Sequence, residues 1–319
     1  MTKRVSLFRR STLAAILVAG SASMAAQSPQ PQQSTLFRST LDLVTLHVTV
    51  TGPSGRLIED VKNDELIILE NGKPQELTVF QQGGLPLAVT ILLDTSSSMR
   101  ADFRDVQEAA IAFLRRLQPA DIASVIGFGS TVRVLQSFTT DRAALENAVR
   151  AAVPKGETAL YTAVYIALQE LNKTAERTDD TPRRRVAVVL SDGDDTSSLL
   201  GFRELLDAAA RSDVTIYGIR MRPGKSGAPT PGNAEAVLRE LARQSGGRAF
   251  VPASRHQVGL VYEEIRDELE RQYAVGYVSR DTRKDGAFRS ISVQVRRAGA
   301  RARAKQGYFA PVASRSWRQ

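Results

Sequence analysis

The 319-residue chain is predicted to be an α/β protein, in which a doubly wound, mostly parallel six-stranded sheet flanked by helices is joined to a smaller all-β unit. Two observations predict this fold class. Between residues 85 and 269, short apolar runs alternate with segments whose apolar residues recur at helical spacing, which indicates strands alternating with helices. On both sides of this region, apolar and polar residues alternate one by one, which is typical of half-buried β-strands. The length suffices for two compact units.

The first 26 residues have the pattern of a secretory leader. Lys3, Arg4, Arg9 and Arg10 precede a short apolar core, and small residues suitable for cleavage follow. The core is too short for a comfortable membrane span, so we expect an exported protein, periplasmic or extracellular, with no stable membrane span after leader removal. An uncleaved leader that acts as an anchor is the alternative. The predicted segments are a signal peptide at 1–26, a linker at 27–35, a β segment at 36–84, the α/β domain at 85–269 and a second β segment at 270–312.

The amino-terminal β segment contains an alternating strand and a hairpin. Residues 44–50 place four apolar side chains on one face of the strand, which predicts that this face is buried. Asn71-Gly72 predicts a tight hairpin turn, with the return strand at 77–80. His47 falls on the polar face of the first strand, so we expect a solvated or neighbour-paired histidine there and not a catalytic one.

The α/β region contains six apolar runs of strand length. We expect the pair that flanks Gly129-Ser130 to be antiparallel and the other strands to be parallel. Helical spacing is clear at 106–117, 160–171 and 260–269, and residues 223–233 form a Gly- and Pro-rich loop. The six expected strands lie at 87–93, 122–128, 132–135, 186–190, 214–219 and 248–251.

The carboxy-terminal β segment is short and basic. Its alternating strands, at 273–277, 291–295 and 301–305, are too few to cover a core alone, so we expect them to pack with the amino-terminal strands. Residues 271–319 contain twelve Lys or Arg and two Asp, which could meet anionic glycans, lipid or nucleic acid. A solvated β-face with alternating arginines is the preferred interpretation, and few aromatic residues accompany them, which argues against a nucleic-acid partner.

Composition excludes several function classes. The chain has no cysteine and only two histidines, so disulfides, zinc sites of the Cys and His type and Cys-His triads are excluded. The sequence contains no Gly-x-Ser-x-Gly elbow, phosphate loop or dinucleotide fingerprint. We therefore predict no catalytic residues and a protein that is not an enzyme.

Oxygen-bearing side chains follow two of the predicted strands and open one predicted helix. Asp94, Ser96 and Ser98 form Asp-x-Ser-x-Ser after the run 87–93, Asp192 follows the run 186–190, and Thr158 precedes a helix. Ligands bind at the carboxyl edge of open α/β sheets, and oxygen donors suit Mg²⁺, Mn²⁺ or Ca²⁺. The Ser-rich turn alone is equally consistent with a helix cap. With Thr158 and Asp192 in order behind it, the pattern predicts a metal site.

This pattern resembles the metal-ion-dependent adhesion site of von Willebrand factor type A domains. The wider chain is similar to the secreted acidobacterial proteins related to that family, in stretches such as Glu70 to Gln75, Leu93 to Met99 and Gln272-Tyr273. The resemblance implies that the two serines bind the cation directly, that the threonine binds it directly or through water, and that the aspartates act mostly through water. Ser97 and Glu157, where the family usually has glycine, and Thr162, where it often has Asp, put the choice of partner in doubt.

The resemblance implies a secreted, metal-ion-dependent interaction module of the adhesion type. Neutral hydroxyl ligands leave the cation electrophilic, so the expected partner is a protein that presents an acidic residue. Two alternatives stay open. One is a metal-dependent hydrolase, in which Ser96 or Ser98 is a nucleophile or the cation activates water. The other is a structural component of the cell envelope that binds an anionic polymer through its basic tail.

Overall fold

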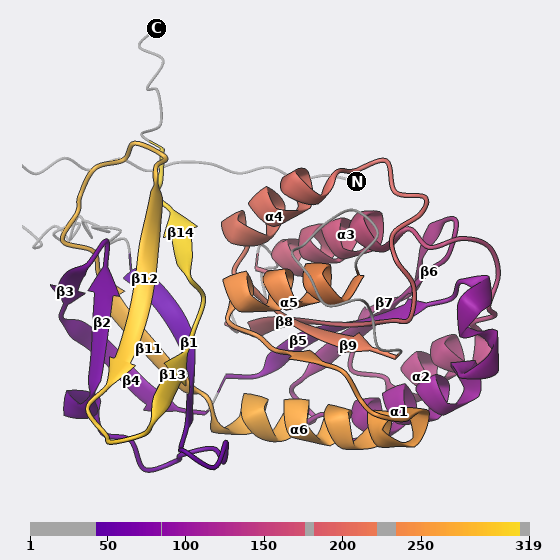
Figure 1. The fold of residues 1–319 in the computed structure, drawn as a ribbon, viewed down its shortest axis with the longest axis horizontal. Coiled ribbons are helices and arrows are strands. Elements are labelled where there is room, and N and C mark those ends of the chain that lie inside the picture. Colours follow the sequence, from indigo (N-terminus) through magenta and orange to yellow (C-terminus); the bar gives the residue numbers. More distant parts are fainter. Residues whose placement is uncertain (1–42, 84, 176–181, 222–233, 313–319) are drawn as a thin grey trace, which may run out of the picture. The chain divides into compact units, whose positions relative to one another are not determined.

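The protein is described by a computed structural model that covers residues 43–83, 85–175, 182–221 and 234–312. The predicted signal peptide and linker and the loop at 223–233 lie outside the described residues. Within them, a mixed six-stranded sheet with helices on both faces is joined to two small antiparallel sheets, as predicted (Figure 1). None of the helices in the described ranges is long and apolar enough to cross a membrane.

The large sheet has the strand order β10-β9-β8-β5-β6-β7, and only β7 runs antiparallel to its neighbour. All eight residues of β5 are buried, because a central strand covered on both faces must be apolar almost throughout. The strands are β5 (Leu87–Asp94), β6 (Ile122–Phe128), β7 (Val132–Thr139), β8 (Arg184–Ser191), β9 (Val214–Arg220) and β10 (Ala249–Phe250).

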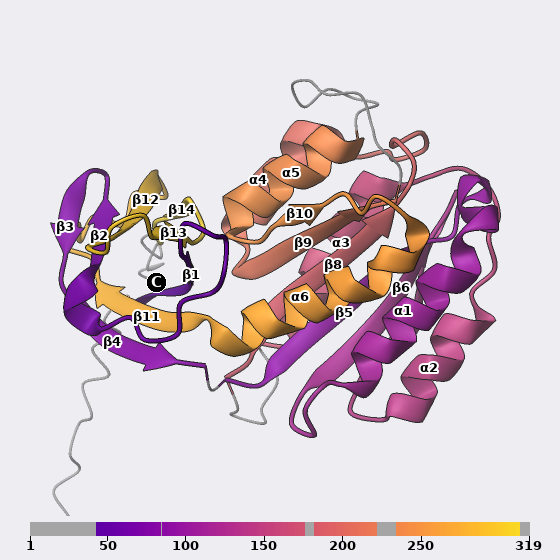
Figure 2. The same cartoon turned by 60° about the horizontal axis from the view of Figure 1, so that its bottom comes forward.

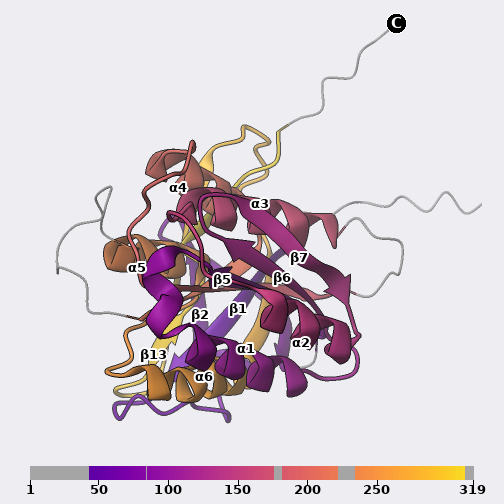
Figure 3. The ribbon, with the colours of Figure 1, turned by 90° about the vertical axis from the view of Figure 1, so that its right-hand side faces the viewer.

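Three helices cover each face of this sheet, as the edge-on view in Figure 3 shows. Val89, Ile91 and Leu93 of β5 face one helix layer, and Ala88 and Leu92 face the other. The first layer contains α1 (Phe103–Arg115), α2 (Arg142–Ala151) and α6 (Val258–Arg271). The second contains α3 (Leu160–Lys173), α4 (Phe202–Arg211) and α5 (Ala234–Ser245).

The β unit combines strands from both ends of the described chain (Figure 2). One sheet has the order β13-β1-β11-β4 and the other β14-β12-β2-β3, and both are antiparallel. The amino-terminal strands are β1 (Leu43–Thr51), β2 (Leu66–Glu70), β3 (Lys73–Gln75) and β4 (Leu77–Gln82). The carboxy-terminal strands are β11 (Tyr273–Val278), β12 (Phe288–Val295), β13 (Arg301–Arg303) and β14 (Gly307–Phe309).

The hairpin at Asn71-Gly72 is present, but its return strand differs from the predicted one. Asn71 has φ 48° and Gly72 φ 76°, and the turn pairs Glu70 with Lys73. The return strand is therefore β3, whereas β4, expected to return beside β2, pairs with β11 in the other sheet. The local pattern predicts a strand at 77–80 correctly, but its partner depends on residues nearly 200 positions away.

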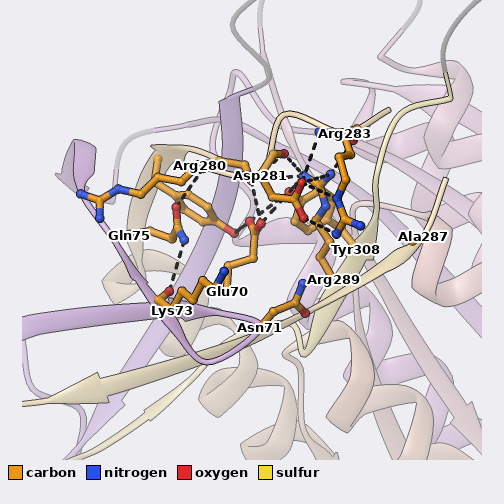
Figure 4. A network of polar contacts seen from close by, with 12 residues as sticks. Glu70, Asn71, Lys73, Gln75, Arg280, Asp281, Arg283, Ala287, Arg289 and Tyr308 are labelled. Carbon is orange, nitrogen blue, oxygen red and sulfur yellow. Dashed lines mark hydrogen bonds and ion pairs between the residues drawn. The ribbon is translucent and has the colours of Figure 1, made fainter. Parts of the chain in front are cut away.

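A buried carboxylate organises the interior of the β unit (Figure 4). Glu70 accepts hydrogen bonds from the hydroxyls of Tyr277 (2.8 Å), Ser279 (2.7 Å) and Tyr308 (3.0 Å). The Arg289 guanidinium lies 3.8 Å from the carboxylate, and the side chains of Glu70 and Arg289 are 2% and 4% exposed. The charge of Glu70 is thus both paired and hydrogen-bonded, which a buried carboxylate requires.

Basic residues of the last strands bind the α/β domain instead of facing water. Arg303 Nη2 lies 2.6 Å from Glu268 Oε2 of α6, and Lys305 Nζ lies 2.6 Å from Asp213 Oδ1. The predicted solvated basic face is therefore correct for the exposed Arg301 and wrong for Arg303 and Lys305. The reason is that the α/β domain places two carboxylates opposite this strand.

Candidate metal site

The five predicted site residues lie on three segments that the sheet brings to one edge. Asp94 ends β5, and Ser96 and Ser98 follow it into the short 3-10 helix η2 (Ser97–Ala101). Asp192 directly follows β8, and Thr158 lies two residues before α3. Because β5 and β8 are parallel neighbours, their carboxyl ends meet at the same edge of the sheet.

Four of the five residues form one chain of hydrogen bonds. The Ser96 amide donates to Asp94 Oδ1 at 2.8 Å, and the Ser96 and Ser98 Oγ atoms lie 2.9 Å apart. Ser98 Oγ donates to Asp192 Oδ1 at 2.7 Å. Residues almost 100 positions apart therefore place their oxygen atoms within hydrogen-bond distance of each other.

Thr158 joins this group across Gly193. A Cβ atom on Gly193 would lie 3.1 Å from Thr158 Oγ1 and 3.8 Å from Ser98 Oγ. The missing side chain of Gly193 thus leaves room beside both hydroxyls. The sequence motif contains this glycine directly after Asp192, and the structure shows why a larger residue would crowd the group.

The site is buried on the side of Asp94 and open on the side of Ser98. Asp94 and Ser96 are 0% and 2% exposed, whereas Ser98 is exposed. Burial raises the pKa of Asp94 to about 6, and the negative charge of Asp192 adds to this, while hydrogen bonds from Ser191 and Ser96 act in the opposite direction. A cation beside Asp94 would favour its charged form and so offset the cost of burial.

The sequence pattern did not single out Ser191, which holds Asp94 in place. Its hydroxyl donates to Asp94 Oδ2 at 2.6 Å, so both carboxylate oxygens of Asp94 have a partner. Ser191 is the last residue of β8 and is fully buried. A hydroxyl at the end of an otherwise apolar strand is the signal that could have identified it.

The loop after Asp192 holds the start of α3. Asp195 Oδ1 accepts hydrogen bonds from the Tyr161 amide (3.1 Å) and the Ser198 hydroxyl (2.7 Å), which is helix-cap chemistry. The Thr158 amide donates to Thr196 Oγ1 at 3.0 Å. Asp195 therefore supports the segment that carries Thr158 and does not join the hydrogen-bonded chain.

The donor set fits a hard divalent cation in chemistry. All five side chains offer oxygen, and three of them are neutral hydroxyls. Within the described residues, no group of three or more His, Cys, Asp or Glu side chains is placed to hold a metal ion. Any cation here would therefore depend on the serine and threonine hydroxyls together with the two aspartates.

Residues 89–194 match the family model of the von Willebrand factor type A domain. The chain carries a von Willebrand factor type A domain, hereafter the VWA domain. All five predicted site residues lie within the matched segment of the VWA domain. The match covers about a third of the chain, so it says nothing about the β unit.

Curated relatives match more than half of the chain. A UPF0353 protein of Mycolicibacterium gilvum is 26% identical over 202 residues, which cover 57% of this chain and 60% of that protein. A UPF0353 protein of Mycobacterium tuberculosis is 26% identical over 201 residues, with the same shares covered. The chain thus spans about 60% of the length of these relatives.

Solved structures are similar at a lower level. A von Willebrand factor type A protein from Catenulispora acidiphila aligns with a TM-score of 0.49 and 13% identity, covering 85% of this chain and 74% of that one. The mussel byssus proximal thread matrix protein 1, described with a zinc-occupied MIDAS motif, gives a TM-score of 0.49 and 12% identity, with 59% and 49% covered. Similarity this low says nothing about what the VWA domain of this chain binds.

A buried arginine stands at the same edge of the VWA domain. Arg220 ends β9 and pairs in register with Ser191, so it lies two strands from Asp94 in the order β9-β8-β5. It is 8% exposed, and its Nε and Nη1 atoms have no hydrogen-bond partner among the described residues. Buried guanidinium groups are normally paired, so Arg220 is unusual. The sequence signal for Arg220 is a charged residue directly after the apolar run 214–219.

Proposed function

We propose that this chain is an exported interaction protein whose VWA domain binds an acidic residue of a partner protein through a divalent cation. Mg²⁺ is the preferred ion, with Mn²⁺ or Ca²⁺ as alternatives. We propose a binding role and not an enzymatic one. The leader-like pattern at residues 1–26 supports export to the periplasm or beyond the cell.

One observation carries this proposal: oxygen atoms from separate loops converge. Ser96 Oγ lies 2.9 Å from Ser98 Oγ, and Ser98 Oγ lies 2.7 Å from Asp192 Oδ1. Three polar groups this close, at the open carboxyl edge of a parallel sheet, need a reason other than packing. A helix cap alone would not require Asp192, which lies 94 positions from Ser98.

The division between hydroxyls and carboxylates supports an acidic guest. Ser96, Ser98 and Thr158 would hold the cation, and Asp94 and Asp192 would orient these ligands and balance its charge. A cation held mainly by neutral oxygens retains charge that attracts a carboxylate. The guanidinium of Arg220, at the same edge, adds positive charge toward such a guest.

Cation binding can be tested with two adjacent serines. Calorimetry with Mg²⁺ and Mn²⁺ on the purified chain should give saturable binding. Ser98→Ala should weaken this binding by at least about tenfold, because it removes one ligand worth roughly 1.4 kcal/mol or more. Asp94→Ala should abolish it.

The matched control is Ser97→Ala. Ser97 Oγ accepts a hydrogen bond from the Gly156 amide, and Ser97 is not a member of the chain formed by Asp94, Ser96, Ser98 and Asp192. Loss of the Ser97 hydroxyl in this variant should leave the affinity for the cation unchanged. Equal binding by the parent chain and the Ser98→Ala and Asp94→Ala variants, each with an unchanged circular dichroism spectrum, would contradict the proposed site.

Partner chemistry can be tested with an array of short peptides. Peptides that contain Asp or Glu should bind in Mg²⁺ and be released by chelator, and amide versions of the same peptides should not bind. Binding that persists in chelator would instead favour an ion-independent surface.

A further inference from the structure

A cavity lies where the β unit meets the VWA domain, at the amino ends of β8 and β9. Its volume is about 240 Å³, several times the ~30 Å³ of a water molecule in the liquid. The charged and titratable groups that line it include His47 of β1, Arg184 and Arg185 of β8, Asp213 and Lys305. This cavity and the candidate metal site lie at opposite ends of β8. Arg184, at the cavity, begins the strand, and Ser191, at the metal site, ends it.

Positive charge exceeds negative charge around this cavity. Asp213 Oδ1 lies 2.6 Å from Lys305 Nζ, and Asp213 Oδ2 lies 3.3 Å from Arg185 Nη2. Arg184 is 6% exposed and donates to neutral acceptors, the side chain of Gln272 and the carbonyl of Leu269. With Arg183, the described residues that line the cavity therefore include four cations and one carboxylate.

The carboxylate lies nearer to water than the cations do. The Asp213 side chain is 63% exposed, whereas those of Arg185 and Lys305 are 18% and 15% exposed. Asp213 thus stands at the mouth, and the cationic stems line the wall. Arg183 also lines the cavity. Buried cations are normally balanced by anions, so the excess of cations among the described lining residues favours an anionic guest.

His47 supplies a polar atom to the same cavity. Its Nδ1 atom is buried and has no hydrogen-bond partner among the described residues. The strand pattern predicts a solvated or neighbour-paired histidine, and the structure shows a half-buried one whose Nδ1 faces neither water nor a partner among the described residues. Burial, and then the positive charges of Arg184, Lys305 and Arg185, lower the pKa of His47 to about 3, while Asp213 acts in the opposite direction. A neutral imidazole can donate one N–H to an anion.

We propose that this cavity binds a small oxyanion of the phosphate class, either inorganic phosphate or the phosphate group of a monoester. The net positive charge of the lining residues attracts an anion, and the arginine and lysine donors suit the oxygen atoms of a phosphate group. The guest would contact residues of the β unit and of the VWA domain at once. It would therefore stabilise the folded chain by a free energy that rises with the logarithm of its concentration relative to Kd.

Two histidines make the test direct, since His47 lines the cavity and His256 is exposed elsewhere. The full chain, labelled at histidine, is titrated with inorganic phosphate at pH 7 in the presence of EDTA, and the imidazole signals are followed by NMR. The His47 signal should shift saturably and the His256 signal should not. Sodium chloride at matched ionic strength should have no saturable effect.

Two matched variants locate the binding. Lys305→Gln should remove the saturable shift, and Arg301→Gln, which changes an exposed cation on the same segment, should retain it. Phosphate should also raise the melting temperature of the parent chain and of Arg301→Gln but not of Lys305→Gln. A second titration with glycerol 3-phosphate distinguishes inorganic phosphate from a phosphate monoester. The compound that binds more tightly identifies the class of guest.

The proposal is overturned if the His47 signal shows no saturable shift, if chloride reproduces the shift, or if Lys305→Gln retains it. Because the titration contains EDTA, its result is independent of the cation proposed at the other end of β8.

Discussion

At the scale of single residues, buried polar side chains with several partners link segments that are distant in the sequence. Glu70 receives three hydroxyl hydrogen bonds and faces a buried arginine. Burial and the hydrogen bond to Glu70 raise the pKa of Tyr277, so its hydroxyl remains a donor. Removing the negative charge of Glu70 would take one of two carboxylates from Arg289, whose guanidinium also lies 3.4 Å from Asp281.

We therefore expect Glu70→Gln to lower the free energy of unfolding by about 2 kcal/mol, because it removes a buried ion pair and the charged acceptor of three hydroxyl hydrogen bonds. Urea denaturation measures this change. Glu76→Gln is the control, because Glu76 is 84% exposed and lies 3.9 Å from an exposed arginine, and its effect should stay within about 0.5 kcal/mol. Equal effects of the two variants would mean that the Glu70 network contributes little.

At the scale of elements, backbone conformation decides where a strand can turn. The turn between β2 and β3 needs two consecutive residues with positive φ, and Asn71 and Gly72 provide them at 48° and 76°. These residue types tolerate that conformation at low cost. This turn also fixes the register in which Glu70 pairs with Lys73. The register matters because the side chain of Glu70 is buried inside the β unit.

Two glycine replacements should act in opposite directions. Gly72→Ala should destabilise the chain by about 1 kcal/mol, because alanine is strained at positive φ. Gly259→Ala, in the first turn of α6 with open space around its Cβ position, should stabilise it by roughly 0.5 kcal/mol. Thermal denaturation compares the two, and destabilisation by Gly259→Ala would contradict this account of the helix.

At the scale of the whole molecule, Glu268 of α6 connects the VWA domain to the β unit. Its Oε1 atom accepts from Thr49 of β1 at 3.1 Å and from Tyr217 of β9 at 2.6 Å. Its Oε2 atom lies 2.6 Å from Arg303 of β13. One buried carboxylate thus joins two strands of the β unit to a helix and a strand of the VWA domain.

Glu268→Ala should lower the free energy of unfolding by about 3 kcal/mol, because it leaves Arg303 and two hydroxyls without their shared acceptor. Glu264→Ala removes a carboxylate one turn earlier on α6, where the ion pair with Arg248 is more than half exposed on both sides. That control should cost less than about 1 kcal/mol. A loss as large as that of Glu268→Ala would place the stabilisation in the helix itself and not in the junction.

Local patterns account for the large sheet and for the positions of the candidate site. Apolar runs and helical spacing depend on neighbouring residues, so the six strands and the two-layered helix arrangement could be predicted. Asp94, Ser96, Ser98 and Asp192 were predicted because each follows a recognisable strand. Ser191 and Arg220 also stand at strand ends, but their importance depends on contacts across strands, which no local pattern specifies.

By itself, the sequence determined which segments are strands and helices, and that oxygen donors stand at strand ends. Periodicity and turn chemistry act over a few residues, so both can be read along the chain. Only the tertiary structure decided that β4 pairs with β11, that Arg303 and Lys305 face carboxylates, and that His47 faces a cation-lined cavity. These features join residues at least 35 positions apart, and no local pattern specifies which distant partner a strand or charge will meet.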